Sequence, residues 1–86
     1  MPHVLHLVKD PANATALDTI RAQAADPGVR VSVVLMQDAV QLAEPLPGQI
    51  YRLRDEHHAL PPSAPDAIGP GELLDLIFAA DSVVTW

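Results

Sequence analysis

The chain has 86 residues, of which 49% are hydrophobic and only 3% aromatic, so it is expected to form one small domain around an aliphatic core. Five Lys and Arg against eleven Asp and Glu give a net charge of −6, which argues against direct binding to nucleic acid or an anionic membrane surface. The absence of cysteine excludes disulfides, cysteine-ligated metal clusters and any persulfide chemistry carried by this chain.

The N-terminal half alternates strand and helix patterns. Residues 4–8 form an apolar run that predicts a buried strand followed by a turn. Residues 13–25 repeat apolar side chains at steps of three and four, which predicts an amphipathic helix that Asp10 or Asn13 could cap. Residues 29–36 are rich in valine and predict a second strand, buried on both faces in its second half.

The C-terminal half is less regular. Residues 59–71 hold four prolines and two glycines, so we expect a long loop there with no regular element. Asp38 is placed to cap a short helix, and Pro70 suits the first turn of a later one. The predicted elements after Asp38 are a short helix over 39–42, a strand over 49–54, a helix over 72–80 and a strand over 82–86.

Strands that alternate with helices predict an α/β fold, with a parallel sheet of about four strands and helices on both faces. Ligands of such sheets bind beyond the carboxyl ends of the strands. The polar or aromatic residues that follow the predicted strands are Lys9, Asp10, Asp38, Arg54, His57, His58 and Trp86. We therefore take these seven as candidates for a ligand or partner site.

The candidates allow two interpretations. Lys9, Asp38 and Arg54, with His57 or His58, could line a pocket of a small enzyme or ligand-binding domain. Asp10 and Asp38 are equally explained as helix caps. The chain has no glycine-rich phosphate loop and no nucleophile elbow around a serine, so no residue is assigned a catalytic role.

The four histidines do not form a metal-binding pattern. His3 and His6 would point to opposite faces of one strand, and the neighbours His57 and His58 would diverge. We expect His6 to pack in or near the core with one hydrogen bond, and His57 and His58 to be exposed on a loop. Neither a metal nor another cofactor is predicted.

An apolar surface is expected, because a chain of this size has few helices to cover its sheet, and exposed apolar patches usually mark interfaces. Trp86 either anchors such a contact or plugs the end of the sheet, and both interpretations stay open. No apolar run reaches the roughly 20 residues of a membrane-spanning helix, and the first residues lack the basic start of a signal peptide. We expect a cytoplasmic protein.

Four segments of the chain resemble one known family. They are Leu5–Pro11, Val34–Val40, Ile50–Asp55 and the stretch from Glu72 to Trp86. In their order and spacing these segments resemble the DsrE/DsrF/DsrH-like sulfur-relay superfamily, and within it the DsrH/TusB branch. The resemblance covers nearly the whole chain, although each motif is short.

The resemblance implies a small flavodoxin-like subunit that assembles with itself or with DsrE/F/H-like subunits. The family passes sulfur as a cysteine persulfide to carrier proteins, for tRNA thiolation or sulfur oxidation. Its cysteines map near Leu53 and Arg54, or between Lys9 and Asn13, where this chain has no thiol. The resemblance therefore implies a non-catalytic docking or scaffolding subunit, or an orphan member that has left sulfur chemistry.

Overall fold

The computed structural model describes residues 2–42, 45–61 and 64–86. Its elements are β1 (His3–Val8), α1 (Ala14–Ala24), β2 (Arg30–Leu35), the 3-10 helix η1 (Gln37–Gln41), β3 (Gln49–Leu53), β4 (Ala67–Ile68), α2 (Pro70–Ala79) and β5 (Ser82–Thr85). The five strands form one sheet in the order β4-β3-β2-β1-β5, and each strand pair is parallel. The predicted α/β class is confirmed.

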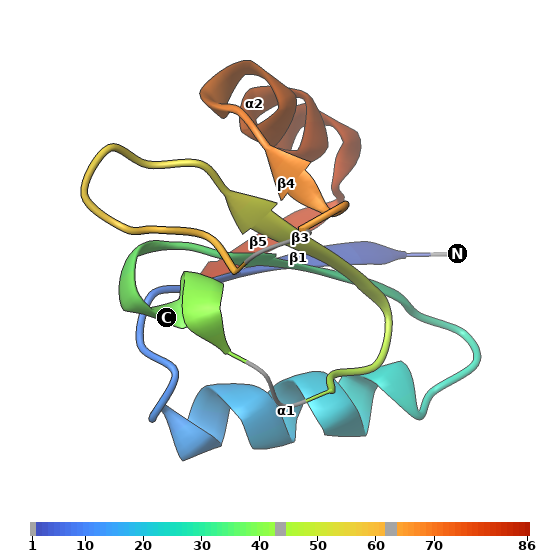
Figure 1. The fold of residues 1–86 in the computed structure, drawn as a ribbon. Coiled ribbons are helices and arrows are strands. Elements are labelled where there is room, and N and C mark those ends of the chain that lie inside the picture. Colours follow the sequence, from blue (N-terminus) through green and yellow to red (C-terminus); the bar gives the residue numbers. More distant parts are fainter. Residues whose placement is uncertain (1, 43–44, 62–63) are drawn as a thin grey trace.

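The fold has three layers (Figure 1). Helix α1 and the short η1 lie on one side of the sheet, and α2 lies on the other. Carboxyl ends of all strands point to one edge, where η1 and the long segment after β3 also lie. That edge is where a parallel sheet positions its ligand sites. Within the described residues, no helix is long and apolar enough to span a membrane.

The prediction of an irregular loop over residues 59–71 is wrong at its C-terminal end. Ala67 and Ile68 form β4, because the backbone N–H of Arg52 donates to the Asp66 carbonyl and that of Arg54 donates to the Ile68 carbonyl. The nearby prolines do not interrupt this ladder, since Ala67 and Ile68 keep their own N–H groups. Helix α2 then begins at Pro70, two residues earlier than predicted, with proline in the first turn as expected.

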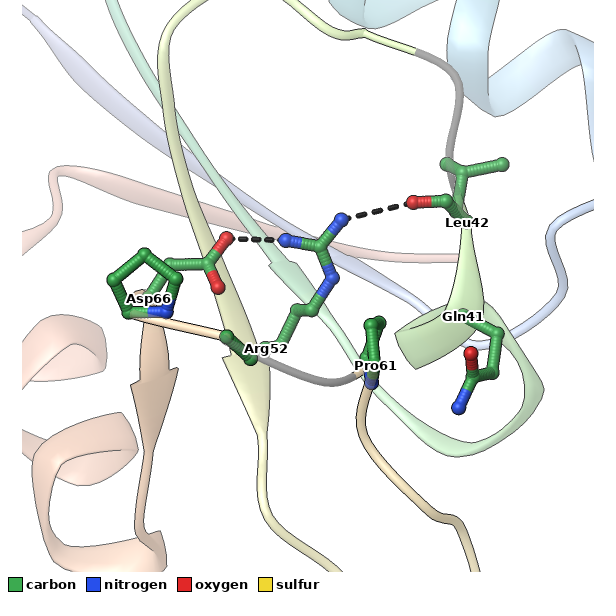
Figure 2. Close-up of a pocket in the computed structure, with 7 residues that line it drawn as sticks. Gln41, Leu42, Arg52, Pro61 and Asp66 are labelled. Carbon is green, nitrogen blue, oxygen red and sulfur yellow. Dashed lines mark hydrogen bonds and ion pairs between the residues drawn. The ribbon is translucent and has the colours of Figure 1, made fainter.

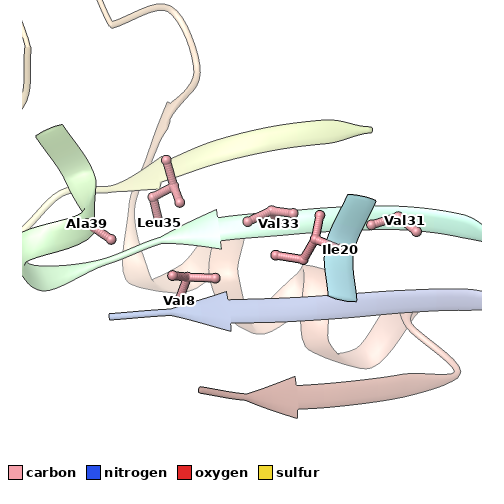
Figure 3. Close-up of a cluster of buried hydrophobic side chains, with 6 residues drawn as sticks. All are labelled: Val8, Ile20, Val31, Val33, Leu35 and Ala39. Carbon is pink, nitrogen blue, oxygen red and sulfur yellow. The ribbon is translucent and has the colours of Figure 1, made fainter. Parts of the chain in front are cut away.

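The core consists of two aliphatic clusters, one on each side of the sheet. The cluster beneath α1 and η1 is shown in Figure 3 and contains Val8, Ile20, Val31, Val33, Leu35 and Ala39. The cluster beneath α2 centres on Leu5, Val34 and Ile68. β2 contributes to both clusters, as expected for a strand buried on both faces.

The helix caps differ in part from the prediction. Asn13 caps α1, its side chain accepting from the Ala16 N–H, while Asp10 accepts from the Ala12 N–H in the preceding turn. Asp38 does not cap η1, because it already lies inside the first turn, and Met36 occupies the cap position without a side-chain bond. The carboxylate of Asp38 is directed instead to His58.

Candidate functional site

Three of the polar residues near the carboxyl edge come together. His58 lies between two carboxylates, with its Nδ1 atom 3.1 Å from Asp55 Oδ2 and its Nε2 atom 3.4 Å from Asp38 Oδ1. The side chain of His58 is only 27% exposed, so the prediction of an exposed His58 is wrong. The cause is that residues 55–58 turn back on themselves, with an isolated antiparallel bridge between Asp55 and His58.

This cluster ties the segment after β3 to η1. Both ring nitrogens of His58 face a carboxylate oxygen. The backbone N–H of His57 donates to Asp55 Oδ1 at 2.7 Å. This hydrogen bond, and secondly the one from His58, hold the pKa of Asp55 below its ordinary value of 3.8.

Of the other charged candidates, His57 joins this cluster through its backbone N–H. Arg54 is directed toward α2, where its guanidinium lies 3.8 Å from Glu72 and both side chains are largely exposed. His57, Lys9 and Asp10 are exposed. In the described parts of the chain, no group of three or more His, Asp or Glu side chains has a metal-binding arrangement.

Trp86 packs against His6 at the end of the sheet. Its indole N–H donates to His6 Nδ1 at 3.0 Å, and the two rings stack with centroids 6.1 Å apart. His6 is fully buried, and its Nε2 atom lies 2.6 Å from Gln23 Oε1 on α1. Because the indole only donates, His6 must be the neutral tautomer that carries its proton on Nε2. His6 thus makes two side-chain hydrogen bonds rather than the one predicted.

This contact fills the edge of the sheet between β1 and β5, where the strand order reverses. That position is the usual ligand crevice of an open parallel sheet. Trp86 is half-buried and packs against the cluster beneath α1. In this structure Trp86 plugs the end of the sheet, while a role as a partner anchor stays a prediction.

A pocket of about 460 Å³ lies instead beside β3 and η1 (Figure 2). It is lined by Gln41, Leu42, Arg52, Pro61, Ala64, Pro65 and Asp66, none of which was a candidate. The guanidinium of Arg52 forms an ion pair with Asp66 and donates to the carbonyl oxygens of Val40 and Leu42. Among the described residues, the buried Asp66 Oδ1 atom has no hydrogen-bond partner.

One sequence signal could have identified Arg52. In β3 the alternation places Ile50 and Arg52 on the same face, so an arginine stands at a position that faces a core layer. A charged side chain at such a position needs a partner. The identity of that partner, Asp66, could not be read from the sequence because it lies in the segment expected to be irregular.

Two large apolar side chains on the outer side of α2 are exposed. Leu74 is 52% exposed and Phe78 is 79% exposed, four residues apart and therefore neighbours on the helix surface. Val83 on β5 is 40% exposed and pairs in register with Leu5, which belongs to the cluster beneath α2. No residue of α2 is fully buried. We refer to Leu74 and Phe78 together as the α2 face.

Comparisons with protein-family models, with curated proteins and with solved structures gave no match.

Proposed function

We propose that the chain is a cysteine-free, non-catalytic and oligomer-forming subunit of a sulfur-relay system, with a docking or scaffolding role. The observation that carries this proposal is the α2 face. The side chain of Phe78 is 79% exposed on a helix. Its unfavourable contact with water is removed only when another surface covers it. A subunit has such a surface available, whereas a monomer does not.

Two further observations support the docking role. Lys9, Asp38 and Arg54, with His57 or His58, would have to line one cavity in a pocket-based function, but the pocket beside β3 is lined by other residues. The chain also has no thiol at either position that the resemblance assigns to the relay cysteine. A subunit without the nucleophile would act by holding cysteine-bearing partners, and we propose that it does so in the cytoplasm.

Size-exclusion chromatography with light scattering tests this proposal. The chain is run alone at micromolar concentration, and then mixed with cysteine-bearing DsrE- and DsrF-like subunits and a sulfur-carrier protein. We expect a stable complex that Phe78→Asp disrupts. Ala22→Asp is the matched control, because it adds the same charge on the exposed face of α1. A strict monomer that ignores these partners would refute the proposal.

A second candidate function is ligand binding in the pocket beside β3. The wall of this pocket favours it, because the carboxylate of Asp66 lies there beside the N–H groups of Arg52. An acceptor beside donors suits a neutral ligand that presents both, such as a primary carboxamide. NMR titration with small carboxamides should shift the resonances of Gln41 and Asp66, and the absence of any shift at millimolar concentration would remove this candidate.

A further inference from the structure

The net charge of the protein is confined to the C-terminal third of the chain. In residues 1–54, five Lys and Arg are balanced by five Asp and Glu, whereas residues 55–86 contain six Asp and Glu and no Lys or Arg. The C-terminal part therefore carries the whole charge of −6. This part includes α2, the element that carries the α2 face.

Acidic side chains border the α2 face. Asp75 lies three residues before Phe78, so these two side chains are neighbours on the helix surface. Asp81 follows α2 and accepts a hydrogen bond from the His3 N–H at 2.7 Å. Glu72 lies in the first turn, where exposed Arg54 at 3.8 Å neutralises it in part.

The end of α2 strengthens this negative character. Its last turn contains no basic residue, although the carbonyl end of a helix carries a partial negative charge that Lys or Arg would stabilise. Asp81 stands at that end instead. An apolar centre with an acidic border is complementary to a surface with apolar side chains bordered by Lys and Arg.

We infer that the α2 face binds a different protein that presents an amphipathic helix with a basic border, rather than a second copy of the same face. Two copies facing each other across a two-fold axis would bring Asp75 and Asp81 toward their own counterparts, and like charges at an interface oppose association. The ridge formed by Leu74 and Phe78, at i and i+4, is the spacing that helix-to-helix recognition uses. The inference rests on the docking part of the proposed function.

The test uses the full chain, labelled for NMR, and three synthetic peptides of equal length. The first peptide is an amphipathic helix with a leucine stripe bordered by lysines. In the second, glutamates replace the lysines, and in the third, serines replace the leucines. We expect the first peptide to bind at least tenfold more tightly than either of the others and to shift the resonances of Leu74 and Phe78.

Variants then localise the contact. Phe78→Ala should weaken binding of the first peptide at least tenfold. Asp75→Asn should weaken it about threefold, and less at high salt, because salt screens the attraction between the Asp75 carboxylate and the lysines of the peptide. Asp18→Asn is the matched control, since Asp18 is an exposed carboxylate on α1, and it should leave binding unchanged. Circular dichroism verifies that each variant is folded, and Leu74→Ala serves as a second apolar variant.

Three outcomes would overturn the inference: equal binding of the lysine and glutamate peptides, shifts confined to other surfaces, or self-association of the chain that Phe78→Ala abolishes. Failure of the sulfur-relay assignment is separable from these. If the relay subunits do not bind but the basic peptide does, only that assignment falls. If the relay subunits bind and Phe78→Asp disrupts their complex, but the lysine peptide binds no better than the glutamate peptide, the inference falls and the assignment stands.

Discussion

The contact between Trp86 and His6 makes a quantitative prediction for the variant Trp86→Phe. Phenylalanine keeps an aromatic ring but has no N–H, so His6 Nδ1 would lose its donor while the ring stays buried. A lost hydrogen bond costs about 0.5–1.5 kcal/mol, and an unsatisfied buried acceptor costs about 1–3 kcal/mol. Because these ranges describe overlapping effects, we expect a loss of about 2 kcal/mol in the free energy of unfolding.

For a domain of this size, that loss corresponds to a decrease in Tm of roughly 8–16 °C. Unfolding is followed by far-UV circular dichroism, because Trp86 is the only tryptophan and its fluorescence is absent in the variant. A double-mutant cycle with His6→Phe separates the hydrogen bond from ring packing, since the loss of the Gln23 contact is common to both arms.

We expect a coupling energy of about 1 kcal/mol or more between the two positions. Nitrogen NMR of the imidazole should also show the proton of His6 on Nε2. A loss below about 0.5 kcal/mol in Trp86→Phe, or a proton found on Nδ1, would refute the assignment of the hydrogen bond and of the tautomer.

Three further predictions concern the fold and its charges. Gly48→Ala should lower the free energy of unfolding by more than about 1 kcal/mol, because φ of Gly48 is +91° and the added Cβ would lie 2.7 Å from a carbonyl oxygen of β2. Gly71 has open space around it, so Gly71→Ala should not lower the free energy of unfolding. Equal melting temperatures of the two variants would contradict this prediction. Arg52→Ala should lower the free energy of unfolding, measured with urea, by about 3 kcal/mol, because it leaves the carboxylate of Asp66 unpaired in a largely buried site. A decrease below about 1 kcal/mol would show that the fold does not require this ion pair. Carbon NMR of Asp55 should give a pKa below 3.8. The ionised carboxylate of Asp55 therefore stabilises the fold at a pH above its unfolded-state pKa, and this contribution is lost as the pH falls through the lower folded-state pKa. A titration midpoint at or above 3.8 would contradict the hydrogen bonds assigned to Asp55.

The sequence alone determined the local elements. The apolar run before Lys9, the valine-rich stretch over 29–36 and the helical spacing over 13–25 each match an observed strand or helix, because burial imposes a period of two on strands and of 3.6 on helices. The order of these elements then led to the parallel sheet, which is the arrangement that such alternation permits. The two-residue β4 has no period to detect, and only its pairing with β3 makes it a strand.

The tertiary structure decided which residues meet. Trp86 and His6 are 80 residues apart, and Arg52 meets Asp66 across a proline-rich segment, so no local pattern could pair them. The outer face of α2 is the clearest case. Leu73, Leu74, Leu76, Ile77 and Phe78 form a broad apolar surface on α2 that only Glu72 and Asp75 interrupt, and so broad a surface does not reveal which part of it the sheet covers. The position of the sheet placed Leu74 and Phe78 outward, and this choice created the surface on which the proposed function depends.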